Sequence, residues 1–288
     1  MNEPELDCLR CFDFEGAAVR GGIVRLGTAL TDVLAQHFYP PPAAGLLGEA
    51  LAASALLSAT LKFSGSLSLQ ARSEGSVPLL FAECGHDRRL RGYARVAEGA
   101  HATGFGAMLS RGNLAITITP DQGQRYQGIV PLEQPELAGC LEDYFDQSEQ
   151  LPTLIRLASD GVTAAGLMLQ VLPGGRATDP EWEHLRHLSA TVRTEELLAD
   201  PFERLLWKLF HEEGVRLQPP ESVAFGCRCS QTRAAATLQA IGEAESRSVL
   251  AEQGLIKIQC EFCQQEYRFD AVALELLFGP DIQAPTRH

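Results

Sequence analysis

One stretch of the chain is apolar on nearly every face that a helix would present. It follows the prolines at residues 40–42, runs from Ala43 to Leu61, and contains a single charged residue, Glu49. A charge near the middle of a bilayer helix costs roughly 2.5–3.5 kcal/mol, and the alanine-rich remainder would offset little of it. Because a helix without a polar face is normally buried, we expect this segment to form the centre of a globular domain.

Short strand-like segments precede and follow this helix. Before it, residues 8–26 predict one or two strands and residues 28–37 a short helix. After it come three predicted strands, two hairpins that turn at residues 120–123 and 160–161, and a helix between them. Their ranges are 66–71, 77–83 and 90–96 for the strands, 114–130 and 153–172 for the hairpins, and 136–150 for the helix. This order predicts an α+β domain with a mixed or antiparallel sheet around a central apolar helix.

A helical linker is expected to follow this domain. Pro173-Gly174-Gly175 has the composition of a boundary, so residues 1–175 would form the core domain and residues 176–221 the linker. Asp179-Pro180 and Asp200-Pro201 each place a capping residue before a proline suited to the first helical position. Glu203 completes a capping box with Asp200. The sequence therefore predicts two helices here.

The second linker helix carries an apolar stripe at helical spacing. Its members are Leu198, Phe202, Leu205, Leu206 and Leu209, and Trp207 and Phe210 widen the apolar face. Such a stripe is typical of a helix that packs permanently on a core. The alternative is a helix that docks on the core domain and can be released, which would expose the stripe as a binding surface.

Two close pairs of cysteines stand near the C-terminus: Cys227-Arg228-Cys229 and Cys260-Glu261-Phe262-Cys263, separated by 30 residues. A folded segment between the pairs can bring four sulfurs to the corners of a tetrahedron, the geometry that zinc favours. We therefore expect one Zn²⁺ per chain in a closed site without a water position. Residues 222–288 would form a small zinc-binding domain of a length that rarely folds well without a staple.

The metal could serve only as that staple, or the same site could act as a redox switch. Metal-bound cysteines are thiolates, the form that peroxide and hypochlorous acid attack. Loss of the metal would remove a binding free energy that reaches about 10–16 kcal/mol in zinc-finger peptides. Disulfides could then form within each pair, Cys227 with Cys229 and Cys260 with Cys263. A C-x-C disulfide closes a tight ring, so it should be strained and readily reduced.

The other cysteines give weaker signals. Cys8 and Cys11 are three residues apart in a predicted strand and should point to opposite faces, which disfavours a shared metal or disulfide. Cys84 and Cys140 have no cysteine close by in sequence, and we expect ordinary buried thiols. The chain has no P-loop, dinucleotide-binding fingerprint or G-x-S-x-G elbow. We expect no enzyme with turnover.

The charge balance bears on partners and location. The formal net charge is −13 and the pI about 5.0, so phosphate backbones and anionic membranes should repel the chain. Between Glu221 and His288, nine acidic residues outnumber six basic ones. This disfavours a zinc ribbon that binds nucleic acid, although a zinc-ribbon adaptor that binds a protein partner constitutively stays open. Residues 1–7 lack the basic start and apolar core of a secretory signal, so we expect a cytoplasmic protein.

Five segments of the chain resemble the redox-regulated chaperone family of heat shock protein 33. They are LLGEALAASALLSATLKFSG at 46–65, RYQGIV at 125–130, YFDQSEQLPT at 144–153, CRCS at 227–230 and CEFC at 260–263. The resemblance implies an ATP-independent holdase that is inactive when reduced and zinc-bound, and active after oxidation and zinc release under oxidative stress.

The same resemblance assigns roles to residues and partners. It implies that Cys227, Cys229, Cys260 and Cys263 are the zinc ligands and the redox-active thiols. It also implies a linker that unfolds with the zinc domain, exposes apolar surface to unfolded client proteins, and accompanies formation of a homodimer. Cys8, Cys11 and Cys84 lie outside the family's signature, so an additional disulfide at these positions stays open.

Overall fold

The computed structural model describes residues 4–61, 64–99, 103–174 and 179–279. The chain divides into two compact units, unit 1 (Met1–Gly226) and unit 2 (Cys227–His288). Mixed helices and sheets, with a small C-terminal unit that brings four cysteines together, confirm the predicted α+β class.

The first sheet of unit 1 is antiparallel and has the order β10-β1-β2-β9-β8, with β11 also pairing with β1. Its strands are β1 (Cys8–Phe14), β2 (Val19–Leu26), β8 (Thr153–Ser159), β9 (Ala164–Val171), β10 (Val215–Leu217) and β11 (Glu221–Ser222). Every residue of β9 is buried because both faces of the sheet are covered. The two predicted N-terminal strands and the β8–β9 hairpin are confirmed.

The second sheet has the order β12-β5-β4-β3-β6-β7. Its strands are β3 (Gly65–Arg72), β4 (Leu79–Gly85), β5 (Arg89–Arg95), β6 (Asn113–Pro120), β7 (Tyr126–Pro131) and β12 (Ala224–Phe225). All pairings are antiparallel except β12 with β5, which is parallel. The β6–β7 hairpin turns where the Pro-Asp-Gln-Gly segment predicts it.

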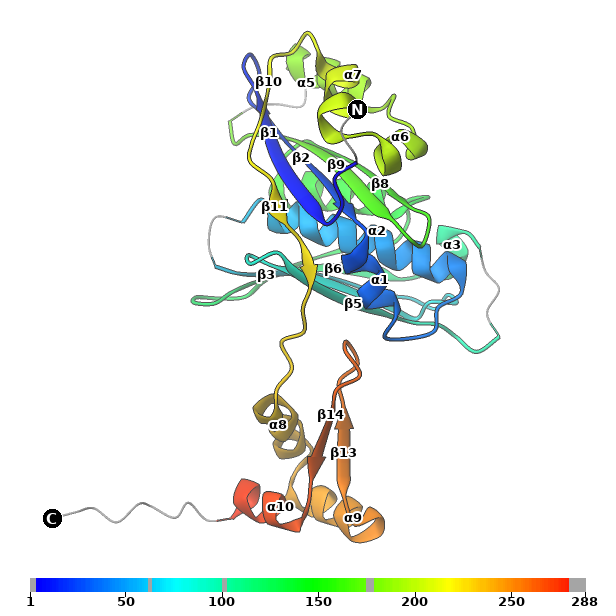
Figure 1. Ribbon diagram of the computed structural model, residues 1–288, viewed down its shortest axis with the longest axis vertical. Coiled ribbons are helices and arrows are strands. Elements are labelled where there is room, and N and C mark those ends of the chain that lie inside the picture. Colours follow the sequence, from blue (N-terminus) through cyan, green and yellow to red (C-terminus); the bar gives the residue numbers. More distant parts are fainter. Residues whose placement is uncertain (1–3, 62–63, 100–102, 175–178, 280–288) are drawn as a thin grey trace, which may run out of the picture. The chain divides into compact units, whose positions relative to one another are not determined.

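The apolar helix α2 (Pro41–Ser58) lies between the two sheets (Figure 1). It begins at the proline run, as predicted, and its leucines reach both sheets where glycines leave room. A Cβ at Gly166 of β9 would lie 2.6 Å from Leu56, and one at Gly92 of β5 would lie 3.1 Å from Leu47. The short helix α1 (Thr28–Leu34) precedes it, and the Asp7 carboxylate accepts hydrogen bonds from the backbone N–H groups at its start.

The helix predicted over residues 136–150 is formed by α4 (Leu137–Tyr144) and one π-helical turn, η1 (Phe145–Glu149). The Tyr144 hydroxyl donates to Glu149 Oε1 over 2.9 Å. On β7, a Cβ at Gly128 would lie 2.4 Å from the Tyr144 ring. The RYQGIV and YFDQSEQLPT segments therefore meet in the fold, and the close approach of the Tyr144 ring accounts for Gly128 in the first of them. The remaining short helix of unit 1 before the linker region is α3 (Phe105–Met108).

Three helices cover the face of the first sheet opposite α2: α5 (Pro180–Ser189), α6 (Thr194–Ala199) and α7 (Phe202–Phe210) (Figure 1). Both predicted helices are present as α5 and α7, and α6 is a third helix that the sequence prediction missed. The predicted capping box of Asp200 with Glu203 is wrong. Asp200 ends α6 in an extended conformation, which the following proline favours, and its carboxylate pairs with Lys208.

Unit 1 thus joins the predicted core and linker in one compact body. The division into a core of residues 1–175 and a linker of residues 176–221 stays a prediction, and the boundary at 175–176 lies outside the described residues. Among the described residues, none of the helices has the length and apolarity that a membrane crossing requires.

The described residues of unit 2 form one hairpin and three helices (Figure 1). The elements are α8 (Gln231–Ile241), α9 (Glu243–Gln253), β13 (Ile256–Gln259), β14 (Glu266–Phe269) and α10 (Ala271–Phe278). The Ser230 and Asp270 side chains cap α8 and α10. Its described core has five buried side chains, Ala234, Leu238, Ile256, Phe269 and Leu274.

Candidate metal centre

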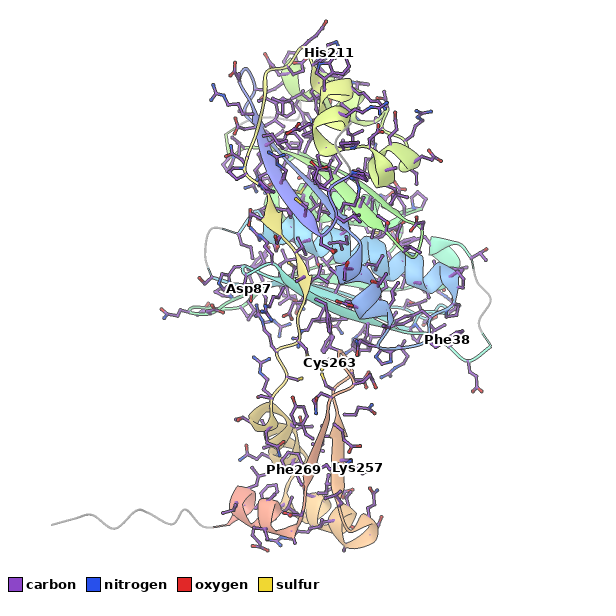
Figure 2. All side chains as sticks on the ribbon, viewed as in Figure 1. Phe38, Asp87, His211, Lys257, Cys263 and Phe269 are labelled. Atoms are coloured by element: carbon purple, nitrogen blue, oxygen red, sulfur yellow. The ribbon has the colours of Figure 1, made fainter. Side chains whose placement is uncertain are left out.

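The fold of unit 2 brings the four paired cysteines together. Cys227 and Cys229 precede α8, while Cys260 and Cys263 lie in the turn between β13 and β14. All four sulfurs lie within 4.8 Å of one another. The sulfurs of Cys227 and Cys260 are 3.6 Å apart, and those of Cys229 and Cys263 are 3.3 Å apart. Figure 2 shows Cys263 at the tip of the hairpin, away from Phe269 and Lys257 at its other end.

Backbone hydrogen bonds fix the turn that carries the second cysteine pair. The Cys260 N–H donates to the Gln265 carbonyl over 3.0 Å, and the Gln264 N–H donates to the Cys260 carbonyl over 2.9 Å. Gln264 adopts φ 57°, in the left-handed region, and so reverses the chain. The turn therefore holds the Cys260 and Cys263 sulfurs on one side of the hairpin end.

The donor set fits a thiophilic metal ion. A tetrahedral site with metal–sulfur distances near 2.3 Å places its sulfurs about 3.8 Å apart, and the separations of 3.6 and 3.3 Å in the cluster lie close to this value. Four sulfur donors without a carboxylate or histidine suit zinc and other soft metals better than magnesium or calcium. The four cysteines could hold one metal ion.

Because the four sulfurs lie so close together, the pKa values of their thiols are shifted in different directions. Burial pushes the pKa of Cys229 upward, but hydrogen bonds from the Tyr267 hydroxyl and from the other cysteines outweigh it and lower the pKa to about 7. For Cys263, burial and its cysteine neighbours raise the pKa. Burial likewise raises the pKa of Cys227. Several thiolates this close repel one another, so a bound cation is the simplest way to ionise them all.

The remaining cysteines stand apart from this cluster. Cys8 belongs to the core under α5–α7, whereas Cys11 packs against the core around α2, which confirms that they occupy opposite faces of β1. Cys84 and Cys140 are buried as predicted. Burial raises the pKa of Cys84 to about 11, which keeps this thiol protonated and unreactive near neutral pH.

The apolar stripe faces the first sheet. Phe202, Leu205, Leu206 and Leu209 are buried, and Leu198 packs against the same core. Phe210 is buried too and contacts β1, with its ring centroid 5.1 Å from that of Phe14. Trp207 is 66% exposed, so the prediction that it widens the buried face is wrong. It lies beyond the edge of the stripe and its ring approaches that of His211 at 5.3 Å.

Arg25 anchors the same helices, and no sequence motif predicts this role. This arginine on β2 is fully buried. Its Nη2 donates to the carbonyls of Leu197 and Asp200, both over 2.7 Å, and its guanidinium lies 4.9 Å from the centre of the Phe202 ring. The only signal in the sequence is an arginine inside the apolar end of β2, a strand that also carries Arg20. Arg25 thereby satisfies carbonyls at the end of α6 and fixes the start of α7.

Three short strands, absent from the sequence prediction, connect α7 to the cysteine cluster. The segment from Val215 to Phe225 contributes β10, β11 and β12 to the edges of the two sheets. Side chains support them: Arg10 donates to the Gln218 carbonyl over 2.8 Å, and Arg88 pairs with Glu221 at 2.7 Å. The last backbone bond before Cys227 runs from the Gly226 N–H to the Leu90 carbonyl, over 2.9 Å.

Comparisons with known proteins cover nearly the whole chain. A family model described as "Hsp33 protein" matches residues 7–270. A protein named 33 kDa chaperonin from Pseudomonas paraeruginosa is 49% identical, and the alignment covers 96% of this chain and 97% of that protein. A protein of the same name from Shewanella woodyi is 45% identical, with 97% and 98% covered.

A solved structure has the same fold. The crystal structure of a 33 kDa chaperonin (heat shock protein 33 homolog) from Thermotoga maritima matches with a TM-score of 0.81, over 93% of this chain and 97% of that one. The two sequences are 23% identical, so this likeness bears on the fold alone.

Proposed function

The chain belongs to the Hsp33 protein family, and on that premise we propose that it is a redox-regulated, ATP-independent holdase chaperone. In this proposal it binds unfolding client proteins under oxidative stress and does not catalyse a reaction on them. The observation that carries the proposal is the cluster of four cysteines in a unit with only five buried apolar side chains among its described residues. The cytoplasmic location and the exclusion of nucleic acid and membranes stay predictions.

The proposed cofactor is one Zn²⁺ per chain, held by Cys227, Cys229, Cys260 and Cys263. Bound zinc would keep the four sulfurs as thiolates and supply much of the folding free energy of unit 2. The hairpin turn and the segment before α8 orient the sulfurs toward one point. The reduced form is then folded in both units and inactive.

Oxidation would convert the cluster into two disulfides, Cys227 with Cys229 and Cys260 with Cys263. Each pair of thiolates gives two electrons to peroxide, whose two oxygens leave as two water molecules after uptake of two protons. Sulfurs in disulfides are poor metal ligands, so the ion departs. Unit 2 is then left with a small apolar core, and we propose that it unfolds.

Unfolding would reach unit 1 through the chain itself. Cys227 directly follows the segment that forms β10, β11 and β12, and these strands have three, two and two residues. Short edge strands have few backbone hydrogen bonds and open at low free-energy cost. Once unit 2 is unfolded, this end of the segment is held by a few bonds such as that from the Gly226 N–H to the Leu90 carbonyl, and the proposed opening continues from there toward α7.

Release of α7 would expose the client-binding surface. We propose that Leu198, Phe202, Leu205, Leu206 and Leu209 bind apolar segments of clients. Burial of a large apolar side chain contributes about 1.5–3 kcal/mol, which keeps the stripe covered in the reduced protein. The buried Arg25 guanidinium also holds α6 and α7 in place through its hydrogen bonds to the carbonyls of Leu197 and Asp200. The oxidised, opened form is proposed to be a homodimer.

The test is suppression of aggregation of a chemically unfolded client protein. Reduced, zinc-loaded protein should be inactive, peroxide-treated protein should be active, and a dithiol reductant should reverse the change. A Cys8→Ser, Cys11→Ser double variant is the control for thiols outside the cluster and should respond as the unaltered protein does. Equal activity before and after oxidation would contradict the switch and favour a constitutive zinc-ribbon adaptor.

A further inference from the structure

A cavity of about 280 Å³ lies between the two sheets of unit 1, and the proposed redox role uses none of its residues. Three of the segments that resemble the family meet around it. The α2 segment contributes Thr60 and Leu61, the YFDQSEQLPT segment contributes four side chains, and Gly128 of the RYQGIV segment leaves room for one of these, the Tyr144 ring. Three motifs that the redox role leaves unexplained therefore share one cavity.

The two sheets line the cavity with different chemistry. The first sheet contributes the polar side chains of Arg20 on β2 and Gln170 on β9, whereas the second contributes apolar side chains from β3 and β6. The apolar lining residues are Leu61, Leu67, Ile116, Ile118, Phe145 and Leu151. A ligand that fits this lining has one polar end and an apolar body.

Arg20 is held in place through two of its three nitrogens. Its Nε donates to Gln170 Oε1 over 3.1 Å, and its Nη2 donates to the same oxygen. Gln170 is 1% exposed and is itself fixed, because its Nε2 donates to Thr153 Oγ1 over 2.9 Å. Among the described residues, Arg20 Nη1 has no acceptor and no carboxylate pairs with the guanidinium. The first sheet therefore presents a preorganised cationic donor to the cavity.

The charges around the cavity favour an anion at Arg20. Burial lowers the pKa of Arg20, because its charge is incompletely solvated. The Glu149 carboxylate also lines the cavity, but it accepts a hydrogen bond from the Tyr144 hydroxyl over 2.9 Å and is exposed, so water screens its charge. An anionic group next to the guanidinium would thus compensate a partly buried cation.

The backbone at one wall of the cavity is unusual. The wall includes η1, a π-helical turn, and Gln150 directly after it adopts φ 53°, in the left-handed region that residues other than glycine rarely enter. Such conformations cost free energy and persist where the surrounding structure fixes them, frequently at ligand sites. Here they shape the wall that carries Phe145 and Glu149.

We propose that this cavity binds an aliphatic carboxylate, with its carboxylate on the Arg20 guanidinium and its hydrocarbon chain against the apolar side chains of the second sheet. The carboxylate accepts a charge-assisted hydrogen bond from Nη1, and each methylene group removed from water strengthens binding about fourfold. A peptide C-terminus fits less well, because its N–H and C=O groups would face apolar side chains that offer them no hydrogen bond. The site is separate from the cysteine cluster and does not depend on its redox role.

The experiment titrates octanoate into full-length, reduced, zinc-loaded protein in a calorimeter. Octanoate should bind, whereas 1-octanol, which lacks the charge, and hexanoate, which lacks two methylene groups, should each bind about tenfold or more weakly. Arg20→Gln should weaken octanoate binding about tenfold or more and change 1-octanol binding less than about twofold, which shows that the cavity is intact. The matched control is Arg111→Gln, at an arginine that is 83% exposed, and it should leave octanoate binding unchanged.

A second measurement needs no variant. In protein with labelled isoleucine methyl groups, the signals of Ile116 and Ile118 should shift on addition of octanoate, and those of Ile256 and Ile258 in unit 2 should not. Unshifted signals of Ile116 and Ile118, or equal octanoate affinity of Arg20→Gln and the unaltered protein, would overturn the inference. Tighter binding of N-acetyl-glycyl-leucine than of octanoate would also overturn it, in favour of a peptide terminus.

Discussion

Unit 1 and unit 2 differ most in how much apolar surface each one buries. Unit 1 has a continuous core around α2 and a second core beneath α5–α7. Unit 2 has five buried apolar side chains among its described residues and one cluster of four sulfurs. A large core is stable without help, whereas a small one commonly requires a metal or a disulfide. The cysteine cluster is therefore placed where its loss has the largest structural effect.

The same contrast appears inside unit 1. The helix α2 is covered by a sheet on each side, and nearly all of its residues are buried. The helix α7 covers one sheet face only, and Trp207 on its outer side is exposed. An element packed on one side loses fewer contacts when it detaches. If unit 2 unfolds as proposed, α5 to α7 are thus the part of unit 1 best suited to respond.

The largest effect is expected from metal removal. Chelation should unfold unit 2, because binding free energies at such sites reach about 10–16 kcal/mol, while the sheets of unit 1 should persist. Circular dichroism and limited proteolysis before and after chelation check this. Cys260→Ser should have the same outcome and Cys140→Ser should leave metal binding unchanged. If metal-free unit 2 resisted proteolysis as well as the metal-loaded form, the claim that unit 2 depends on its metal for stability would be wrong.

A substitution in α7 should have the next largest effect. Phe202→Ala removes a fully buried ring and should lower the free energy of unfolding of unit 1 by about 3–5 kcal/mol. On the same helix, Trp207→Ala should change it by less than about 0.5 kcal/mol because the side chain is exposed. Denaturant unfolding of reduced, zinc-loaded protein measures both. Similar values for the two variants would show that the stripe is not docked as described.

A smaller, pH-dependent effect is expected at Glu49 on α2. Burial, with repulsion from Glu136, raises the pKa of Glu49 to about 7. A raised pKa means that the folded state holds the proton more tightly than the unfolded chain. Stability should therefore fall as the pH rises from the unfolded value near 4.5 through 7.

Glu49→Gln removes this dependence and should stabilise unit 1 by on the order of 2–3 kcal/mol at pH 8, with little change near pH 4. The control is Glu98→Gln, at an exposed position. Denaturant midpoints at the two pH values provide the measurement. A gain of equal size at both pH values would point to packing rather than to ionisation.

Much of the fold could be predicted from sequence patterns whose physical causes are local. Helix α2 follows from an apolar run behind a proline start, the hairpins follow from their turn residues, and the two cysteine pairs follow from their spacing. Their physical causes lie within a few neighbouring residues. The same holds for Cys8 and Cys11, whose opposite faces follow from strand periodicity.

Features with distant causes were missed or misjudged. The strands β10 to β12 have two or three residues each, and they exist because β1 and β5 offer unpaired edges. Arg25 is buried because carbonyls of α6, far away in sequence, accept its hydrogen bonds. The Tyr267 contact with Cys229 depends on the register of β14. Local sequence patterns do not identify these partners, because each of them lies far away in the sequence.

The central claim is that oxidation of the small unit releases helices of the large one. Amide hydrogen exchange of reduced and peroxide-treated protein tests it most directly, read together with zinc content and client binding. We predict that oxidation speeds exchange throughout unit 2 and across residues 180–225, while α2 and the central strands of both sheets stay protected. Full protection of α7 in an oxidised, zinc-free protein that binds clients would contradict the account.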